Sequence, residues 1–281
     1  MPNPPSAARR SALQVHADAG VAYVRIDHPP INLLDLPLSR ELDAVTRELA
    51  DAADIRVLVF ESALPDYFLS HADLPLLQRA RDAGVYADVS QLGFYQQILE
   101  RLRTMPKATI GIVDGLARGG GAELALALDM VFASPAARFS QMEILLGINP
   151  GGGGAQYLAR KAGRSRALEL CLGGADVGAE LAVAYGYANR VLPADELRPF
   201  VDRLAHAIAS YPAEAIAANK ANVLAAEPPH EPGLLDAHRK FSALVSNAEF
   251  DRRVEAFLGG DGQTADGERT DPIAFAERLA L

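Results

Sequence analysis

The chain has 281 residues, of which 49% are hydrophobic and 22% are charged, a balance typical of a globular protein with one large domain or a core plus an appendage. Its 36 acidic and 27 basic residues give a formal net charge of -9. This balance argues against broad nucleic-acid binding, because that function needs a basic surface to displace counterions from the nucleic acid.

The first part of the chain alternates predicted strands and helices. Two alternating stretches on either side of Asp18-Ala19-Gly20 predict a β-hairpin. Apolar residues spaced as one helix face predict a helix over 38–54. The next predicted elements are a buried β-branched strand at 55–62, a helix at 88–104 that Met105-Pro106 ends, and a second buried strand at 108–115.

The second part becomes increasingly helical. Two short strands are predicted around Pro135, and two helices are predicted on either side of Gly163. From about residue 195 the pattern is mainly helical; 259–271 resembles a Gly/Asp/Thr-rich linker, and a last short helix is predicted after it. Strand–helix alternation indicates an α/β fold with parallel strand pairing in the first two-thirds. We therefore expect a core with an N-terminal arm at 1–195 and a helical C-terminal region at 196–281.

Three observations bear on the compartment. Cys171 is the only cysteine, so no internal disulfide can form and a reducing compartment is expected. The stretch MPNPPSAARR has no apolar region after it and does not resemble a secretory signal. No run approaches eighteen consecutive apolar residues, so no membrane span and no membrane partner are predicted. We expect a cytoplasmic protein.

The stretch GLARGGGAELALALD, residues 115–129, places three glycines between a predicted strand and a predicted helix. Such a junction exposes backbone N–H groups at a helix start, which carries about half a positive charge. It can therefore hold a phosphate or stabilise a carbonyl oxygen that becomes negative during a reaction. The residues of a phosphate loop are missing here and two acids follow, so the carbonyl site fits better.

Those two acids are Glu123, one turn into the predicted helix, and Glu143, which precedes a second glycine cluster. Two carboxylates in one apolar pocket can divide the work of moving a proton and activating water. Burial and a neighbouring charge raise a carboxyl pKa, so that one acid stays protonated near neutrality. Taken alone, Glu123 could instead be an acid that interacts favourably with the helix dipole, and Glu143 a solvated loop acid.

These residues closely resemble the crotonase family, the enoyl-CoA hydratases and isomerases. The resemblance covers roughly residues 20–260 and depends on the order and spacing of five segments: HPPINLLD, FLSHADL, GLARGGGAELALALD, ARFSQMEILLGINPGGGGAQYL and AELAVAYGYANRVLPADEL. It implies a crotonase-like spiral of ββα units and a helical C-terminal trimerisation region. It also implies an acyl-CoA thioester substrate and a homotrimer or a dimer of trimers.

The resemblance also implies a role for individual residues. The N–H groups of Ala72 and Gly120 would form an oxyanion hole for the thioester oxygen. Glu123 would orient and deprotonate a water at C3, and Glu143 would deliver a proton to C2, giving syn addition of water across the 2,3-double bond. Both glutamates are retained in the hydratases of this family, so enoyl-CoA hydratase is the activity that the resemblance favours.

Four further residues are expected at the substrate. Gly151 matches a glycine that lines the acyl pocket, and the backbone around Asp73 and Leu74 matches the contact to the adenine part of CoA. His71 stands where the family usually has glycine, so it either lines the pocket or alters the backbone there. Met142 replaces the usual proline before the second glutamate, which bears on acyl-chain preference.

Several alternatives stay open at this point. A crotonase-fold isomerase or a thioester hydrolase would use the same oxyanion hole, and a non-catalytic acyl-CoA-binding protein would bind the same ligand. No HExxH or paired-cysteine pattern is present, so no metal site is expected, and no cofactor is expected beyond the CoA of the substrate.

Overall fold

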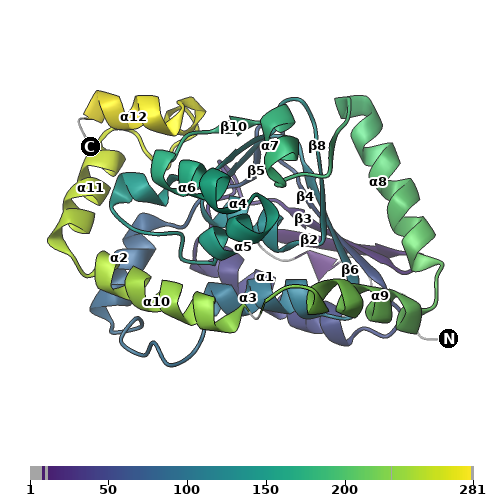
Figure 1. The fold of residues 1–281 in the computed structure, drawn as a ribbon. Helices are drawn as coiled ribbons and strands as arrows, with labels where there is room; N and C mark the ends of the chain where they lie inside the picture. Colours follow the sequence, from purple (N-terminus) through teal and green to yellow (C-terminus); the bar gives the residue numbers. More distant parts are fainter. Residues whose placement is uncertain (1–7, 10–11, 229, 280–281) are drawn as a thin grey trace.

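The computed structural model describes residues 8–9, 12–228 and 230–279, so residues 1–7, 10 and 11 of the predicted N-terminal arm lie outside the described part. The molecule consists of two β-sheets, in which most neighbouring strands are parallel, and of helices that cover them (Figure 1). The long sheet has the order β1-β2-β3-β4-β6-β8-β11, and the short sheet has the order β10-β9-β7-β5. The predicted α/β class is confirmed.

The strands of the long sheet are β1 (Ala8–Arg9), β2 (Leu13–Asp18), β3 (Val21–Ile26), β4 (Val57–Ser62), β6 (Ala108–Val113), β8 (Met130–Ala133) and β11 (Arg190–Val191). Those of the short sheet are β5 (Tyr67–Leu69), β7 (Leu116–Arg118), β9 (Arg138–Ser140) and β10 (Val177–Gly178). The helices of the first part are α1 (Leu36–Asp51), α2 (Leu74–Asp82), α3 (Phe94–Thr104), α4 (Gly120–Ala127), the 3-10 turn η1 (Met142–Leu146), α5 (Gly154–Lys161), α6 (Arg164–Gly173) and α7 (Ala179–Tyr185). Those of the second part are α8 (Ala194–Ala209), α9 (Ala213–Ala225), α10 (Glu231–Val245), α11 (Ala248–Gly259), the 3-10 turn η2 (Gly267–Arg269) and α12 (Pro272–Leu279).

A strand–strand–helix unit repeats along the chain, as predicted. In three successive units the first strand enters the long sheet and the second enters the short one: β4 then β5, β6 then β7, and β8 then β9. Within each sheet these strands pair in parallel with the corresponding strand of the next unit. The segments that leave β5, β7 and β9 are therefore brought side by side, and these segments carry the predicted site residues.

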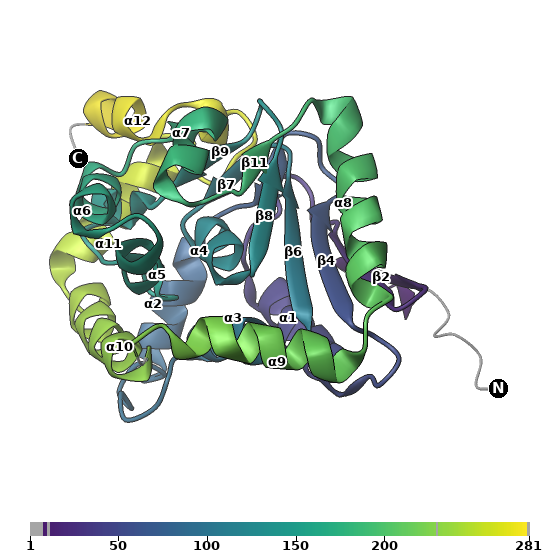
Figure 2. The same cartoon turned by 45° about the vertical axis from the view of Figure 1, so that its right-hand side comes forward.

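The core lies on both faces of the long sheet. Side chains alternate along β4, so that Leu58 and Phe60 face a cluster with α1, α3 and α4, whereas Val57 and Val59 face α8. Figure 2 shows α8 along one face of the sheet and α4 beside the other. Burial on both faces explains why these strands are continuous apolar runs in the sequence.

The local signals in the sequence set most element bounds. Ala19 and Gly20 have positive φ angles of 45° and 85° in the predicted hairpin turn. Helix α1 begins where Asp35 caps it by accepting a hydrogen bond from the N–H of Leu38 at 2.9 Å. The helices predicted on either side of Gly163 are confirmed as α5 and α6.

Two helices differ from the prediction. The helix expected at 88–104 begins only at Phe94, because Asp88 accepts hydrogen bonds from Ser90 in a tight turn and Gly93 precedes the first helical residue. The long helical stretch near the C-terminus is broken at Asn247, whose extended backbone and side-chain bond to the N–H of Glu249 start α11. The division of the chain at residue 195 stays a prediction.

Candidate active site

The three glycines of the strand-to-helix junction are required by close packing. A Cβ on Gly121 would lie 1.8 Å from the carbonyl oxygen of Leu69 at the end of β5, and a Cβ on Gly120 would lie 2.7 Å from the side chain of Leu34. Gly119 has φ 49° and ψ -119°, a conformation that residues with a side chain rarely adopt. The start of α4 therefore lies directly against the segment that leaves β5.

The segment that contains Ala72 packs beside this helix start. Its neighbours make a short parallel pairing with Leu34: the N–H of Leu34 donates to the carbonyl of His71, and the N–H of Asp73 donates to the carbonyl of Leu34, both at 3.1 Å. In an extended chain the N–H of the residue between them points to the opposite side. Gly119 packs against the same segment, because a Cβ on Gly119 would be 2.8 Å from the Cβ of His71.

Both predicted oxyanion-hole donors are thus on neighbouring segments. Gly120 is the first residue of α4, so its N–H has no acceptor within the helix. In the described part of the chain, the N–H of Ala72 donates to no backbone carbonyl. Two backbone donors beside a helix start can hold a developing negative charge.

Glu123 is buried, with 2% of its surface exposed, and its carboxylate is held by the second glycine cluster. Its Oε1 atom accepts hydrogen bonds from the N–H groups of Gly152 and Gly154, both at 2.8 Å. Burial raises the pKa of Glu123, the N–H groups of the glycine loop lower it, and the result is a pKa of about 7. The electropositive start of α5 thus binds a carboxylate of the protein itself.

Glu143 lies on η1, directly after β9, and is 8% exposed. A Cβ on Gly119 would lie 3.1 Å from its Oε1 atom, so the carboxyl group is at the helix start of α4. Among the described residues its buried Oε2 atom has no hydrogen-bond partner. Burial and the charge of Glu123 raise the pKa of Glu143 well above its ordinary value.

The two glutamates therefore differ in what surrounds each carboxyl group. N–H groups of the glycine loop partly offset burial at Glu123, whose pKa is about 7, whereas burial and the charge of Glu123 both raise the pKa of Glu143. A pair of this kind provides one proton donor and one proton acceptor in the same apolar site.

Sequence reasoning did not single out Tyr95 or the glycines that hold Glu123. Tyr95 on α3 donates a hydrogen bond from its hydroxyl to the carbonyl of Gly120 at 2.7 Å. A Cβ on Gly152 would lie 2.5 Å from Oε2 of Glu123. The run of four glycines was the available signal for the second contact; nothing in the sequence indicates the first.

The remaining predicted substrate residues lie around this centre. The imidazole of His71 is 4% exposed, and both of its ring nitrogens face protein atoms: Nε2 lies 2.9 Å from Oε1 of Glu268, and Nδ1 lies 3.1 Å from the carbonyl of Ala72. Asp73 precedes α2, pairs with Arg79 at 3.4 Å, and burial raises its pKa. Their roles toward substrate stay predictions.

Leu74 and Gly151 both contact the C-terminal helices. Leu74 is 1% exposed in a cluster that joins η1 to α10, α11 and α12, and a Cβ on Gly151 would lie 2.9 Å from the ring of Phe241 on α10. Helices from the end of the chain therefore cover the side of the site formed by η1 and the start of α2, as Figure 1 shows for α10 and α2.

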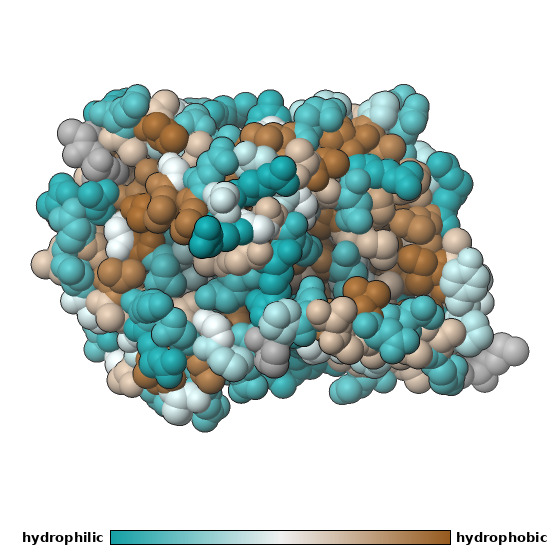
Figure 3. Space-filling view, viewed as in Figure 1, coloured by the Kyte–Doolittle hydropathy of each residue, from teal (hydrophilic) through white to brown (hydrophobic). Residues whose placement is uncertain are grey.

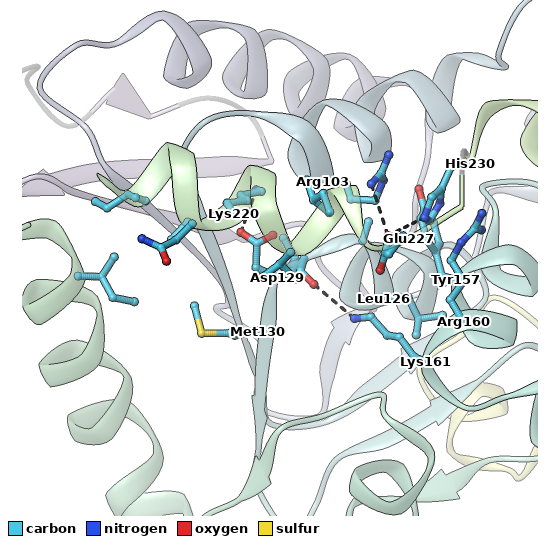
Figure 4. Close-up of a pocket in the computed structure, with 18 of the residues that line it drawn as sticks. Arg103, Leu126, Asp129, Met130, Tyr157, Arg160, Lys161, Lys220, Glu227 and His230 are labelled. Carbon is cyan, nitrogen blue, oxygen red and sulfur yellow. Dashed lines mark hydrogen bonds and ion pairs between the residues drawn. The ribbon is translucent and has the colours of Figure 1, made fainter. Parts of the chain in front are cut away.

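A separate cavity of about 630 Å³ lies at the C-terminal end of α4, beneath α9, and neither glutamate lines it (Figure 4). Several of its charged side chains are paired with one another. Lys220 bonds Asp129 at 2.9 Å, and Glu227 lies between Arg103 and His230.

In the described ranges, no cluster of three or more His, Cys, Asp or Glu side chains could hold a metal ion. No helix in those ranges is long and apolar enough to cross a membrane.

Comparison with known proteins gives a consistent result. A family model described as enoyl-CoA hydratase/isomerase matches residues 16–260. The probable enoyl-CoA hydratase EchA17 of Mycobacterium bovis is 31% identical over 254 residues, which cover 90% of this chain and 91% of the relative. The probable enoyl-CoA hydratase echA8 of Mycobacterium tuberculosis is 30% identical over 246 residues, 87% of this chain and 93% of the relative.

Solved structures resemble the whole fold. A crystal structure of a "putative enoyl-CoA hydratase" from Streptomyces avermitilis has a TM-score of 0.89 at 38% identity and covers 97% of this chain and 99% of that chain. A crystal structure of enoyl-CoA hydratase from Bacillus halodurans has a TM-score of 0.79 at 25% identity and covers 88% of this chain and 100% of that chain.

Proposed function

Because the chain belongs to the enoyl-CoA hydratase/isomerase family, we propose that it is an enoyl-CoA hydratase that adds water in syn fashion across the 2,3-double bond of an acyl-CoA thioester. The observation that carries this proposal is the pair of buried carboxyl groups of Glu123 and Glu143 at the start of α4. The pKa values of both groups are raised. Hydration needs a base and an acid at one site, and these two groups supply them.

In the proposed reaction, ionised Glu123 accepts a proton from water as the water oxygen bonds to C3. Protonated Glu143 gives its proton to C2, so that the elements of water are added; the starting state returns when the proton held by Glu123 is replaced on Glu143. The N–H groups of Ala72 and Gly120 hold the negative charge that develops on the thioester oxygen between these steps. Removing one donor of this kind costs roughly a hundredfold or more in kcat.

The test is turnover of crotonyl-CoA by the purified protein, with identification of the product. Loss of the enoyl absorbance together with formation of 3-hydroxybutyryl-CoA supports hydration. Glu123→Gln and Glu143→Gln should each lower kcat by about a hundredfold or more, because each removes one proton-transfer group. Glu180→Gln is the matched control, because Glu180 is exposed on α7 and should leave kcat unchanged.

Other products would contradict the proposal. Migration of the double bond would assign isomerase activity, and release of free CoA without hydration would assign thioester hydrolysis. Binding of several acyl-CoA esters without turnover, and without any effect of the two glutamine variants, would assign a non-catalytic acyl-CoA-binding protein.

We expect the protein to act as a homotrimer or a dimer of trimers in the cytoplasm. Apolar surface gathers over α6 and beside α8 (Figure 3). Leu168 and Leu172 are exposed one helical turn apart on α6, which supports burial against a partner. Light scattering should give a multiple of three, and the double variant Leu168→Asp, Leu172→Asp should lower the molecular mass; a monomeric wild-type protein would contradict this expectation.

A further inference from the structure

The segment that follows α11, residues 261–271, is fastened to the two strands that lead into the site. We name this segment the C-terminal strap. The hydroxyl of Tyr67 on β5 donates to the carbonyl of Ala265 at 2.7 Å. The guanidinium of Arg118, the last residue of β7, donates to the carbonyls of Glu268 at 2.7 Å and of Thr270 at 3.1 Å.

One buried carboxylate of the strap joins both strands. Glu268 is 2% exposed; its Oε1 atom lies 2.9 Å from Nε2 of His71 and its Oε2 atom lies 3.2 Å from Arg118. His71 directly precedes Ala72, and Arg118 stands two residues before Gly120. The same carboxylate therefore contacts the residue next to Ala72 and the residue two positions before Gly120, the two positions whose N–H groups would form the oxyanion hole.

The strap also holds the Ala72 peptide from its carbonyl side. The side-chain amide of Gln263 donates to the carbonyl of Ala72 at 3.0 Å, and Nδ1 of His71 lies 3.1 Å from the same oxygen. The N–H of Gln263 in turn donates to Oε1 of Glu268 at 3.1 Å. The two residues that contact the Ala72 carbonyl, His71 and Gln263, are thus both hydrogen-bonded to Oε1 of Glu268.

The charges agree with this geometry. Burial by itself would raise the pKa of Glu268, but the charges of His71 and Arg118 and the hydrogen bond from His71 lower it to about 2. Burial by itself would lower the pKa of His71, but the charge of Glu268 and its hydrogen bond raise it. A buried ion pair is weak evidence for added stability, because desolvation opposes the attraction of the charges. What the ion pair does provide is a fixed spacing between the elements that it joins.

We propose that Glu268 is a positioning residue that, through His71 and Arg118, sets the spacing between the Ala72 and Gly120 N–H groups. This inference rests on the proposed function in one respect, namely that those two N–H groups polarise a thioester carbonyl. It adds Glu268 to the residues on which the reaction depends, as a group that acts through His71 and Arg118 and not on the reacting atoms.

The experiment replaces Glu268 with glutamine, which has nearly the same shape and lacks the charge. Misplacement of one donor should lower kcat on crotonyl-CoA by about tenfold or more, whereas KM should change by less than about twofold, because the donors act on charge that develops in the transition state. Glu268→Asp restores the charge and should recover part of the lost kcat. Arg269→Gln is the matched control. It removes the exposed ion pair between Arg269 of the strap and Asp66, which lies outside the strap, and it should leave kcat unchanged.

A second readout measures polarisation directly. Sorboyl-CoA, a conjugated dienoyl thioester, should show a red shift in its absorbance when bound, and Glu268→Gln should reduce that shift at saturating ligand. The shift does not require turnover, so a wild-type protein that shifts sorboyl-CoA but hydrates no enoyl-CoA contradicts the proposed function and leaves this inference standing. A wild-type shift that Glu268→Gln leaves intact, or no shift at all, overturns the inference. A lower Tm with unchanged kcat in the folded variant also overturns it, because it assigns Glu268 a purely structural role.

Discussion

The carboxylate of Glu123 on α4 lies 2.8 Å from the backbone nitrogen of Gly152 in the loop before α5. The absence of a side chain at Gly152 makes this contact possible, because a Cβ there would lie 2.5 Å from the other oxygen of the same carboxylate. The orientation of Glu123 is thus set from outside its own helix.

Gly152→Ala should therefore lower kcat on crotonyl-CoA by about tenfold or more, because the added methyl group displaces the Glu123 carboxylate. Gly173→Ala is the matched control, since a Cβ at the end of α6 meets no atom within 4 Å. Steady-state kinetics of the two variants checks this. Equal activity of Gly152→Ala and Gly173→Ala would contradict a role for the glycine loop in holding Glu123.

The pH dependence of kcat/KM should have a rising limb near pH 7, because Glu123 acts only when ionised and has a pKa of about 7. A falling limb at higher pH should follow from loss of the proton of Glu143, whose pKa lies well above its ordinary value. The two limbs report macroscopic values of the coupled pair. The residual activity of Glu143→Gln should keep the rising limb and lose the falling one. Loss of the rising limb instead would assign Glu143 as the base and Glu123 as the acid.

The free energy of unfolding should depend on pH through the same carboxyl group. The folded-state pKa of Glu123 is raised from 4.5 to about 7, so between these values the unfolded chain releases the proton that the folded chain keeps. Stability should therefore fall as pH rises through this window and level off above it. Glu123→Gln removes this contribution, so its stability relative to wild type should rise by roughly 3 kcal/mol between about pH 4 and about pH 8.

Urea unfolding at several pH values measures this difference. Glu180→Gln, at an exposed position, should show no such pH-dependent gain. A Glu123→Gln variant whose stability relative to wild type stays constant with pH would show that the buried carboxyl titrates normally.

Asn32 should be a main determinant of stability near the site. It is fully buried with a φ of 51°, its amide donates to Ser62 and to the carbonyl of Phe68, and its Oδ1 atom accepts from the N–H of His28. Asn32→Ala removes these buried hydrogen bonds and should lower the free energy of unfolding by roughly 2–4 kcal/mol. Asn222→Ala on the exposed face of α9 should change it by less than about 0.5 kcal/mol; similar losses in both variants would argue against this role.

Much of the fold was predictable because its signals are local. The hairpin at Ala19-Gly20, the buried strands, and the helices beside Gly163 follow from turn residues and apolar periodicity within a few positions. The contact between Glu123 and Gly154 joins residues 31 positions apart, so it becomes visible only after the strands have been placed. Family resemblance indicated that Glu123 mattered, but not what holds it.

The strap shows where the sequence analysis failed. Its glycine, aspartate and threonine content correctly indicated turns, and we interpreted it as a linker. Composition does not tell which side chain of such a segment turns inward. Glu268 does so because Arg118 and His71 provide opposite charges in the interior. Arg118 ends β7 and His71 follows β5, which places them 150 and 197 positions earlier in the chain.

The hydrogen bonds from the start of α5 also have a consequence for resetting the enzyme between turnovers. Backbone N–H groups favour the ionised form of the carboxyl group that they contact. In the proposed hydration, once Glu123 has taken a proton from water, its contacts with Gly152 and Gly154 would weaken the hold on that proton. The same loop that aims Glu123 at its substrate would then help it to discharge the proton and regain its anionic state for the next cycle.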